Sequence, residues 1–172
     1  MFKIKNVKTS LKIKKLSLNT VIEYLKTHNI GYIEKSNYII IKFKYIYILF
    51  KPKSLLINHV NITKIPDLEY INKSVNVLTN EVFANLKIDI IYLKIDNITA
   101  VYNLNKSIDL LDIVLKNCEK LKIKYNKEKF PGLFIRFDQG TLIIFHSGKI
   151  ISVGCKSLDN LHVLFDELHK IL

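Results

Sequence analysis

The sequence predicts an α+β protein in which helices cover one face of an antiparallel β-sheet. Three observations support this class. Runs rich in Ile, Tyr and Phe, which are typical of strands, alternate with segments whose apolar residues recur at helical spacing. The order strand, helix, several strands, helix occurs twice along the chain. With 172 residues, the chain is also long enough to bury a sizeable apolar core.

The first half is expected to hold an opening strand, two helices and a group of strands between them. Ser and Asn favour helix starts, and Pro is tolerated in a first helical turn. The predicted elements are a strand at residues 2–11, a helix from a cap at Ser17 or Asn19 to about His28, strands within residues 32–56, and a helix beginning at Pro66.

The second half is expected to repeat that order. Its last helix is the clearest element, because five apolar residues share one helical face. The predicted elements are a strand at residues 86–101, a helix from a cap at Ser107 to about Cys118, strands at residues 122–125, 133–137, 142–146 and 149–153, and a helix at residues 158–171 capped by Ser157.

A weak internal repeat relates the two halves. Asn6 and Asn97 each follow Lys-Ile-x in an opening strand, and Phe50 answers Phe145 near the middle of each half. On periodicity alone, the repeat can equally be a chance similarity in a sequence rich in Ile and Lys. We expect residues 1–84 to form a degenerate first repeat and residues 85–172 a second repeat, within one continuous domain.

The formal net charge of +12 favours a polyanionic partner, either nucleic acid or an anionic membrane surface. AT-rich codons that supply Lys are the alternative explanation. The two cysteines form no disulfide framework, which points to a reducing compartment. The N-terminus lacks the apolar run of a secretory signal. We expect a soluble intracellular protein without a membrane partner.

The segment from Glu128 to Lys156 carries the most specific motifs. Residues 130–136 read Phe-Pro-Gly-Leu-Phe-Ile-Arg, residues 142–151 read Leu-Ile-Ile-Phe-His-Ser-Gly-Lys-Ile-Ile, and residues 154–156 read Gly-Cys-Lys. Together with Lys-Ile-Asp-Asn-Ile at residues 94–98, these motifs resemble the second repeat of the TATA-box-binding protein (TBP) family in order and spacing.

The resemblance implies a TBP-like saddle, in which two pseudo-symmetric repeats form one curved antiparallel sheet with helices on the convex face. The concave face of this family enters the minor groove of AT-rich DNA, where inserted Phe side chains bend the duplex by about 80°, the value associated with the family. The implied function is a DNA-binding transcription initiation factor that recognises TATA-like promoters and nucleates the RNA polymerase initiation complex. A IIB-like factor and the polymerase machinery are the implied protein partners. The protein would act as a monomer on DNA, in the nucleus, or in the cytoplasm for a viral or prokaryotic member.

Within this resemblance, Phe130 and Phe145 match the two wedges of the second repeat. Ordinary core packing is the alternative for both rings. Asn97 and Thr99 are expected to face the base edges, where Asn97 can donate to adenine N3 or thymine O2. The other expected contacts are the apolar residues Ile143, Ile151 and Val153 and the phosphate-binding residues Arg136, Ser147, Lys149 and Lys156.

The first half matches the family only in pattern. The expected DNA-binding residues there are Asn6, the wedge Phe50, and the residues on its face, Ile48, Leu56 and Asn58. No Phe stands at residues 36–38, where the other wedge falls, and Lys8 puts a charge at the groove floor. We therefore expect an asymmetric binder in which the second half bends DNA and the first half relies more on charge.

The turn before Phe130 is the expected partner-binding site. Family members carry an acidic, Leu-containing stirrup there that docks transcription factor IIB. In this chain the turn reads Asn-Lys-Glu-Lys at residues 126–129, and only Glu128 keeps the acidic character. We expect Glu128 and Lys129 to meet a diverged or virally encoded partner.

No catalytic motif competes with this interpretation. The sequence has no P-loop and no Rossmann glycines, and His162 and His169 lack the neighbours of a metal site. We expect no enzyme activity, no cofactor and no metal. Two other functions stay open: a TBP-like protein-interaction module of a transcription complex with little or no sequence-specific DNA binding, and nonspecific electrostatic binding of DNA.

Overall fold

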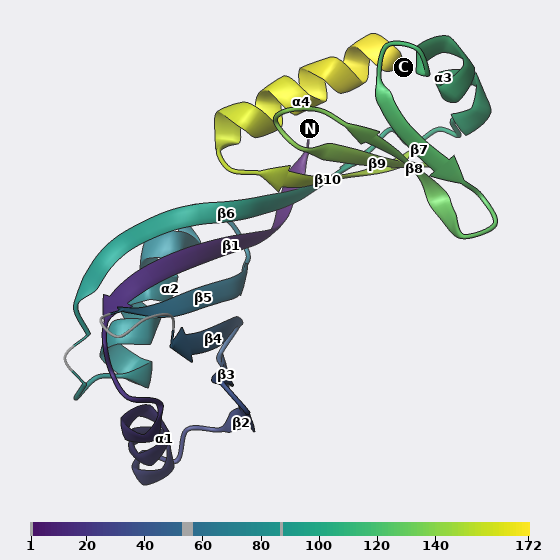
Figure 1. The fold of residues 1–172 in the computed structure, drawn as a ribbon. Coiled ribbons are helices and arrows are strands. Elements are labelled where there is room, and N and C mark those ends of the chain that lie inside the picture. The colour runs from purple at the N-terminus through teal and green to yellow at the C-terminus, as the bar shows by residue number, and fades with distance from the viewer. Residues whose placement is uncertain (1, 53–56, 87) are drawn as a thin grey trace. The chain divides into compact units, whose positions relative to one another are not determined.

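A computed structural model of the chain describes residues 2–52, 57–86 and 88–172 (Figure 1). Two compact units make up the chain. Unit 1 contains Met1–Lys5 and Asp96–Leu172, and unit 2 contains Asn6–Ile95. Strands β1 (Lys3–Lys14) and β6 (Ile90–Asn103) contribute residues to both units. Each unit is an antiparallel sheet with helices, so the predicted α+β class is confirmed.

The sheet of unit 2 has the strand order β2-β3-β4-β5-β1. Successive strands pair antiparallel, and Phe50 lies opposite both Ile39 and Val60. The strands not yet bounded are β2 (Tyr32–Lys35), β3 (Tyr38–Phe43), β4 (Ile46–Pro52) and β5 (Ile57–Ile65).

Three helical segments belong to unit 2: α1 (Leu18–Thr27), α2 (Tyr70–Val77) and the π-helical turn η1 (Leu78–Val82). The predicted cap at Ser17 is confirmed, because its side chain accepts a hydrogen bond from the Thr20 N–H at 3.0 Å. The predicted start of the second helix at Pro66 is wrong. The Asp67 side chain accepts from the Leu68 N–H at 2.6 Å and makes a turn there, so the helix begins only at Tyr70.

The core of unit 2 lies between one face of its sheet and these helices. The ring of Phe83, which follows η1, lies 6.3 Å from that of Phe50 on β4 and 6.2 Å from that of Tyr24 on α1. Phe50 and Phe83 are fully buried. The buried strand residues on this face include Val7, Leu11, Ile13, Ile39, Ile41, Ile46, Ile48, Val60, Ile62 and Ile65.

The sheet of unit 1 has the strand order β6-β10-β9-β8-β7. Its helices pack on one face, where Phe165 of the last helix lies 5.7 Å from Tyr102 of β6, measured between ring centroids. The elements not yet bounded are β7 (Lys122–Asn126), β8 (Phe130–Arg136), β9 (Thr141–Phe145), β10 (Lys149–Cys155), α3 (Leu110–Asn117) and α4 (Leu158–Ile171).

Helix α4 has the predicted bounds, and the Ser157 side chain caps it by accepting from the Asn160 N–H at 3.1 Å. The predicted cap of α3 at Ser107 is wrong. The Ile108 N–H donates to the His146 carbonyl at 2.8 Å and holds that segment extended, so Asp109 caps the helix instead.

Among the described residues, the structure contains no helix long and apolar enough to cross a membrane.

The predicted strand at residues 86–101 begins later than expected, at Ile90. The chain first completes η1 and then a turn in which the Leu86 N–H donates to the Phe83 carbonyl at 2.9 Å. Phe83 is fully buried in unit 2, and the strand therefore starts only after this segment. The apolar pattern of the sequence alone does not reveal this burial.

Candidate nucleic-acid interface

Unit 1 presents a second sheet face opposite its buried side chains, which we call its open face. Successive residues of a strand point to opposite faces. Ile98, Leu142 and Ile150 are buried, and the residues that alternate with them are partly exposed. The open face therefore contains Asn97, Thr99, Val101, Gly132, Phe134, Arg136, Thr141, Ile143, Phe145, Lys149, Ile151 and Val153. All the strand residues of the second half that were predicted to share one face do share it.

Three phenylalanines cluster on this face. The Phe130 ring centroid lies 5.1 Å from that of Phe134 and 5.8 Å from that of Phe145. Phe130 is 39% exposed, whereas ordinary core packing would bury it. Sequence reasoning missed Phe134, although its place in β8, two residues after Gly132, is the signal that could have found it.

The space around Gly132 explains why the Phe-Pro-Gly motif needs a glycine at its third position. A Cβ atom at this position would lie 2.5 Å from Cε1 of Phe130 and 3.0 Å from Cγ2 of Ile143. The absence of a side chain thus gives the Phe130 ring its place beside Phe145. The motif fixes an aromatic side chain at the surface of the open face.

Basic side chains border the phenylalanine cluster. Arg136 lies opposite Lys122 in the pairing of β8 with β7, and Phe134 lies opposite Lys124. These residues and Thr141 line a hollow of about 480 Å³. Sequence reasoning did not select Lys122 and Lys124, because a short basic strand carries no motif. The predicted phosphate contacts Ser147, Lys149 and Lys156 are all exposed.

Asn97 anchors a β-bulge at the edge of the open face. Its side-chain oxygen accepts from the Gly154 N–H at 2.5 Å, and its amide nitrogen donates to the Thr99 hydroxyl at 3.0 Å. In unit 2, the Asn6 side-chain oxygen accepts from the Lys64 N–H at 2.7 Å at the corresponding bulge. Both bulge residues have positive φ, 91° for Gly154 and 63° for Lys64. The predicted equivalence of the two asparagines is therefore confirmed as a structural relationship.

The Ser-Gly-Lys turn between β9 and β10 has a structural role as well. Gly148 has a φ of 80°, and a Cβ atom there would lie 2.1 Å from the Lys106 carbonyl oxygen. The Leu104 N–H donates to the Gly148 carbonyl at 3.0 Å. Glycine thus lets the segment after β6 pass close to the turn and leaves Ser147 exposed beside it.

The predictions for the first half need correction. Ile48, Phe50 and Asn58 were expected on the DNA-facing side, but all three are fully buried on the helix-covered face of unit 2. The Asn58 amide donates to the Leu16 carbonyl at 2.8 Å. Leu56 lies outside the described residues. Asn6 is half-buried, and its side-chain oxygen accepts from the Lys64 N–H at the bulge.

Strand register explains the error over Phe50. Ile39 pairs with Phe50 in unit 2 as Leu133 pairs with Ile144 in unit 1. Phe50 is therefore the counterpart of the buried Ile144, and Lys51 is the counterpart of Phe145. A shift of one residue moves a side chain to the other face of a sheet.

The open face of unit 2 carries more polar and basic residues than that of unit 1. Tyr47 lies at its centre with the Lys64 Nζ 4.0 Å and the Lys42 Nζ 5.7 Å from its ring centroid. The hydrogen bond from Lys64 lowers the pKa of the Tyr47 hydroxyl. By strand alternation, the open face of unit 2 contains Lys8, Ser10, Lys12, Tyr38, Ile40, Lys42, Tyr47, Leu49, Lys51, His59, Asn61 and Thr63.

The turn between β7 and β8 holds the predicted partner-binding residues. Glu128 and Lys129 are exposed there. The Lys129 N–H donates to the backbone and side-chain oxygens of Asn126, both at 3.2 Å, which closes the turn. The two side chains are thus presented from a hydrogen-bonded turn.

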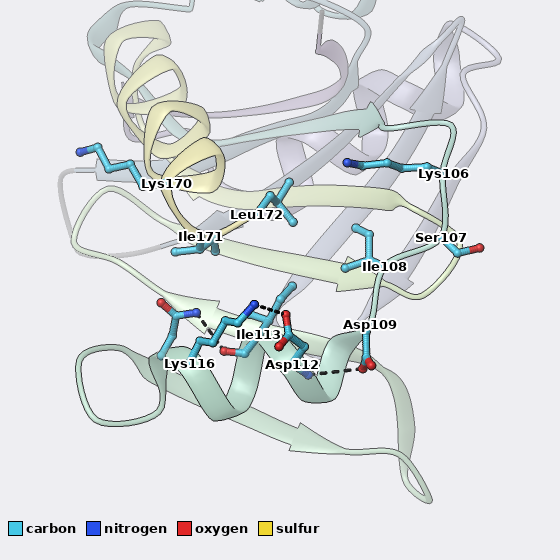
Figure 2. Close-up of a pocket in the computed structure, with 11 residues that line it drawn as sticks. Lys106, Ser107, Ile108, Asp109, Asp112, Ile113, Lys116, Lys170, Ile171 and Leu172 are labelled. Carbon is cyan, nitrogen blue, oxygen red and sulfur yellow. Dashed lines mark hydrogen bonds and ion pairs between the residues drawn. The ribbon is translucent and has the colours of Figure 1, made fainter.

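A separate pocket of about 400 Å³ lies between α3 and the end of α4 (Figure 2). Lys116 donates to Asp112 at 2.7 Å, and Asp109 caps α3. Lys170, also in its lining, pairs with Glu167 at 2.5 Å.

The fold places the chain in a class of solved proteins. It superimposes on TBP from Methanococcus jannaschii with a TM-score of 0.79 and 24% sequence identity, over 99% of this chain and 97% of that one. The class is therefore the TBP fold, as predicted from the resemblance.

Sequence comparison gives the family. The family described as transcription factor TFIID (or TATA-binding protein, TBP) matches residues 92–172. The TATA-box-binding protein of Thermococcus sibiricus is 39% identical over 82 residues, which are 46% of this chain and 43% of that protein. That of Picrophilus torridus is 32% identical over 124 residues, 64% of each chain. Residues 92–172 therefore match the TATA-box-binding protein family, and the chain spans less than half the length of the Thermococcus relative that it matches.

Proposed function

We propose that the chain is a transcription initiation factor that binds AT-rich duplex DNA in the minor groove and bends it with the open face of unit 1. The observation that carries the proposal is the cluster of Phe130, Phe134 and Phe145, in which Phe130 is exposed and the other two residues are half-buried. The same sheet face also carries Ile143, Ile151 and Val153. Exposed apolar patches of this kind mark binding surfaces. The relatives carry the name TATA-box-binding protein, which supports the same ligand.

The chemistry of this face suits the minor groove of A·T base pairs. Ile143, Ile151 and Val153 offer an apolar floor against sugars and bases, and aromatic wedges can enter between base steps. Asn97 and Thr99 lie at the edge of the floor, where they would meet the base acceptors that A·T pairs expose. The bordering cations Arg136, Lys149 and Lys156 would meet phosphates, which position a protein without reading sequence.

Unit 2 would contribute differently. Lys51 stands where unit 1 has Phe145, and Tyr38 stands where unit 1 has Gly132, so neither the wedge nor the space for its partner ring is repeated. Its lysines would attract the DNA backbone, and we propose that only unit 1 inserts aromatic side chains. The resulting complex would have one kinked step in place of two.

The lysines on the open face of unit 2 also fit a second candidate function. A TBP-like domain that serves as a protein-interaction module would have no need of wedges in unit 2, and Lys51 fits that reading. Its partners would include a IIB-like factor and the polymerase machinery, with Glu128 and Lys129 as contacts. The exposed Phe130 favours the DNA-bending function over this alternative.

A gel-shift titration separates the two functions. The probes are an AT-rich duplex and a GC-rich duplex of equal length, at two salt concentrations. The proposal predicts tighter binding to the AT-rich duplex and a loss of that preference in the double variant Phe130→Ala with Phe145→Ala. The matched control is Leu111→Ala with Leu115→Ala on α3, whose side chains are 61% and 78% exposed away from the sheet. Equal binding to both duplexes, unchanged by the phenylalanine substitutions, would refute the proposal.

A further inference from the structure

The two open faces differ at one pair of equivalent positions. In unit 1, Val101 on β6 lies opposite Ile151 on β10. In unit 2, Ser10 on β1 lies opposite Asn61 on β5, and the Ser10 hydroxyl donates to the Asn61 side-chain oxygen at 2.8 Å. Ser10 follows Asn6 at the spacing at which Val101 follows Asn97, so the pairs correspond. Unit 2 thus has a hydrogen-bonded polar pair where unit 1 has an apolar pair.

The neighbours of this pair are both polar and apolar, because Ile40, Ile48 and Leu49 lie beside Lys8, Tyr47 and Thr63. Asn61 and Thr63 line a hollow of about 250 Å³ on the open face of unit 2, together with Lys8, Tyr47 and Leu49 among others. Thr63 pairs with Tyr47 as Val153 pairs with Thr141, so Thr63 is the counterpart of Val153. The floor of unit 2 therefore offers oxygen acceptors where that of unit 1 offers methyl groups.

This difference concerns the one feature that separates base pairs in the minor groove. A·T pairs show only the acceptors adenine N3 and thymine O2, and G·C pairs add the guanine N2 amino donor. Val101 and Ile151 cannot accept from that donor, which would lose its bonds to water without replacement. The Asn61 oxygen keeps a second lone pair beside the one that Ser10 uses, and the Thr63 hydroxyl can also accept.

We propose that unit 2 accommodates a G·C base pair at the position where unit 1 requires A·T, with Asn61 and Thr63 as the acceptors and the buried Ser10 hydroxyl holding the Asn61 side chain. The consequence is directional binding. A site with a G·C pair in one half would be bound with unit 2 over that half. This inference rests on the proposed minor-groove binding.

The test uses the wild-type chain and three duplexes: a palindromic A·T site, the same site with a G·C pair in one half, and the site with G·C pairs at the equivalent positions of both halves. Cys118 is exposed and Cys155 is buried, so one dye on Cys118 reports orientation by energy transfer to a dye at either DNA end. The singly substituted site should bind within about twofold of the A·T site and in one orientation. The doubly substituted site should bind roughly fivefold or more weakly, the usual penalty of a mismatched base pair.

Matched variants assign the effect to the residues. Ser10→Val with Asn61→Ile copies the pair of unit 1 into unit 2 and should abolish the orientation preference. Asn61→Ala removes the acceptor with a smaller change in the sheet and should weaken the preference in the same direction. The reverse change, Val101→Ser with Ile151→Asn, should make the doubly substituted site bind almost as well as the singly substituted one.

The failures of the two proposals are distinguishable. Absence of binding to the A·T site would refute the proposed function itself. Binding to the A·T site, combined with a mixture of both orientations on the singly substituted site or with an unchanged preference in Ser10→Val with Asn61→Ile, would overturn the inference about unit 2 alone.

Discussion

The aromatic rings of Phe130 and Phe145 lie 5.8 Å apart, centroid to centroid, on the open face of unit 1. Phe130 reaches this place from the start of β8 and Phe145 from the end of β9. Their proximity creates a compact aromatic projection, with Phe134 beside it at 5.1 Å from Phe130. Variants of unit 1 and unit 2 can test whether this projection acts on DNA and whether its absence from unit 2 has the expected consequence.

Phe50 and Phe145 should respond to truncation in opposite ways. Phe50→Ala should lower the free energy of unfolding by about 3–5 kcal/mol, because it empties a buried aromatic site beside Phe83. Phe145→Ala should change stability far less and abolish most DNA bending. Urea denaturation and energy transfer between the ends of a labelled duplex measure the two effects. A stable Phe50→Ala variant that no longer bends DNA would show that Phe50 faces the DNA.

Gly132→Ala should displace the Phe130 ring of the aromatic projection. The added methyl group would overlap the exposed Phe130 ring and displace it, so we expect weaker DNA bending with a smaller change in stability. Gly31→Ala is the matched control, because no described heavy atom lies within 4 Å of its added Cβ. Thermal denaturation and the bending assay measure both variants. Equal behaviour of the two alanine variants would contradict the role of Gly132.

Lys122 and Lys124 should contribute to DNA affinity through phosphates. They lie opposite Arg136 and Phe134 at the border of the open face. Each substitution to Gln should reduce the slope of log affinity against log salt by about 0.9 without changing sequence preference. Lys116→Gln is the control, since Lys116 pairs with Asp112 on α3. An unchanged slope in both β7 variants would show that the DNA backbone does not contact Lys122 and Lys124.

The two cysteines should differ in reactivity. Cys118 is exposed, whereas Cys155 is fully buried and burial raises the pKa of its thiol, which lowers the reactive thiolate fraction. A maleimide should therefore modify Cys118 alone in the folded protein and both residues in denaturant. Peptide mass mapping after timed labelling measures this. Rapid labelling of Cys155 without denaturant would show that the β10 bulge region opens readily.

The second half was predictable because its motifs fix both phase and spacing. Helix α4 has a capping Ser157 and a continuous apolar face, and the Phe-Pro-Gly motif sets the phase of β8. In the first half, Ile46–Phe50 is apolar or aromatic at every position, so alternation gives no phase, and only the pairing of β4 with β3 and β5 decides that Phe50 points inward. The basic residues of β7 were missed because their position beside Phe134 depends on that same kind of cross-strand pairing.

The most direct test of a single aromatic wedge from unit 1 is to locate unstacked base steps in the complex. A set of AT-rich duplexes carries 2-aminopurine at successive adenine positions, because its fluorescence rises when the base loses its stacking neighbour. A site with a G·C pair in one half, bound with unit 2 over that half, keeps the two ends of the site distinct. We expect increased fluorescence at one step, beneath unit 1, and its loss in Phe130→Ala with Phe145→Ala. Equal increases at two symmetric steps on a duplex that the Cys118 dye shows to be bound in one orientation, or no increase at any step, would contradict a single wedge supplied by unit 1.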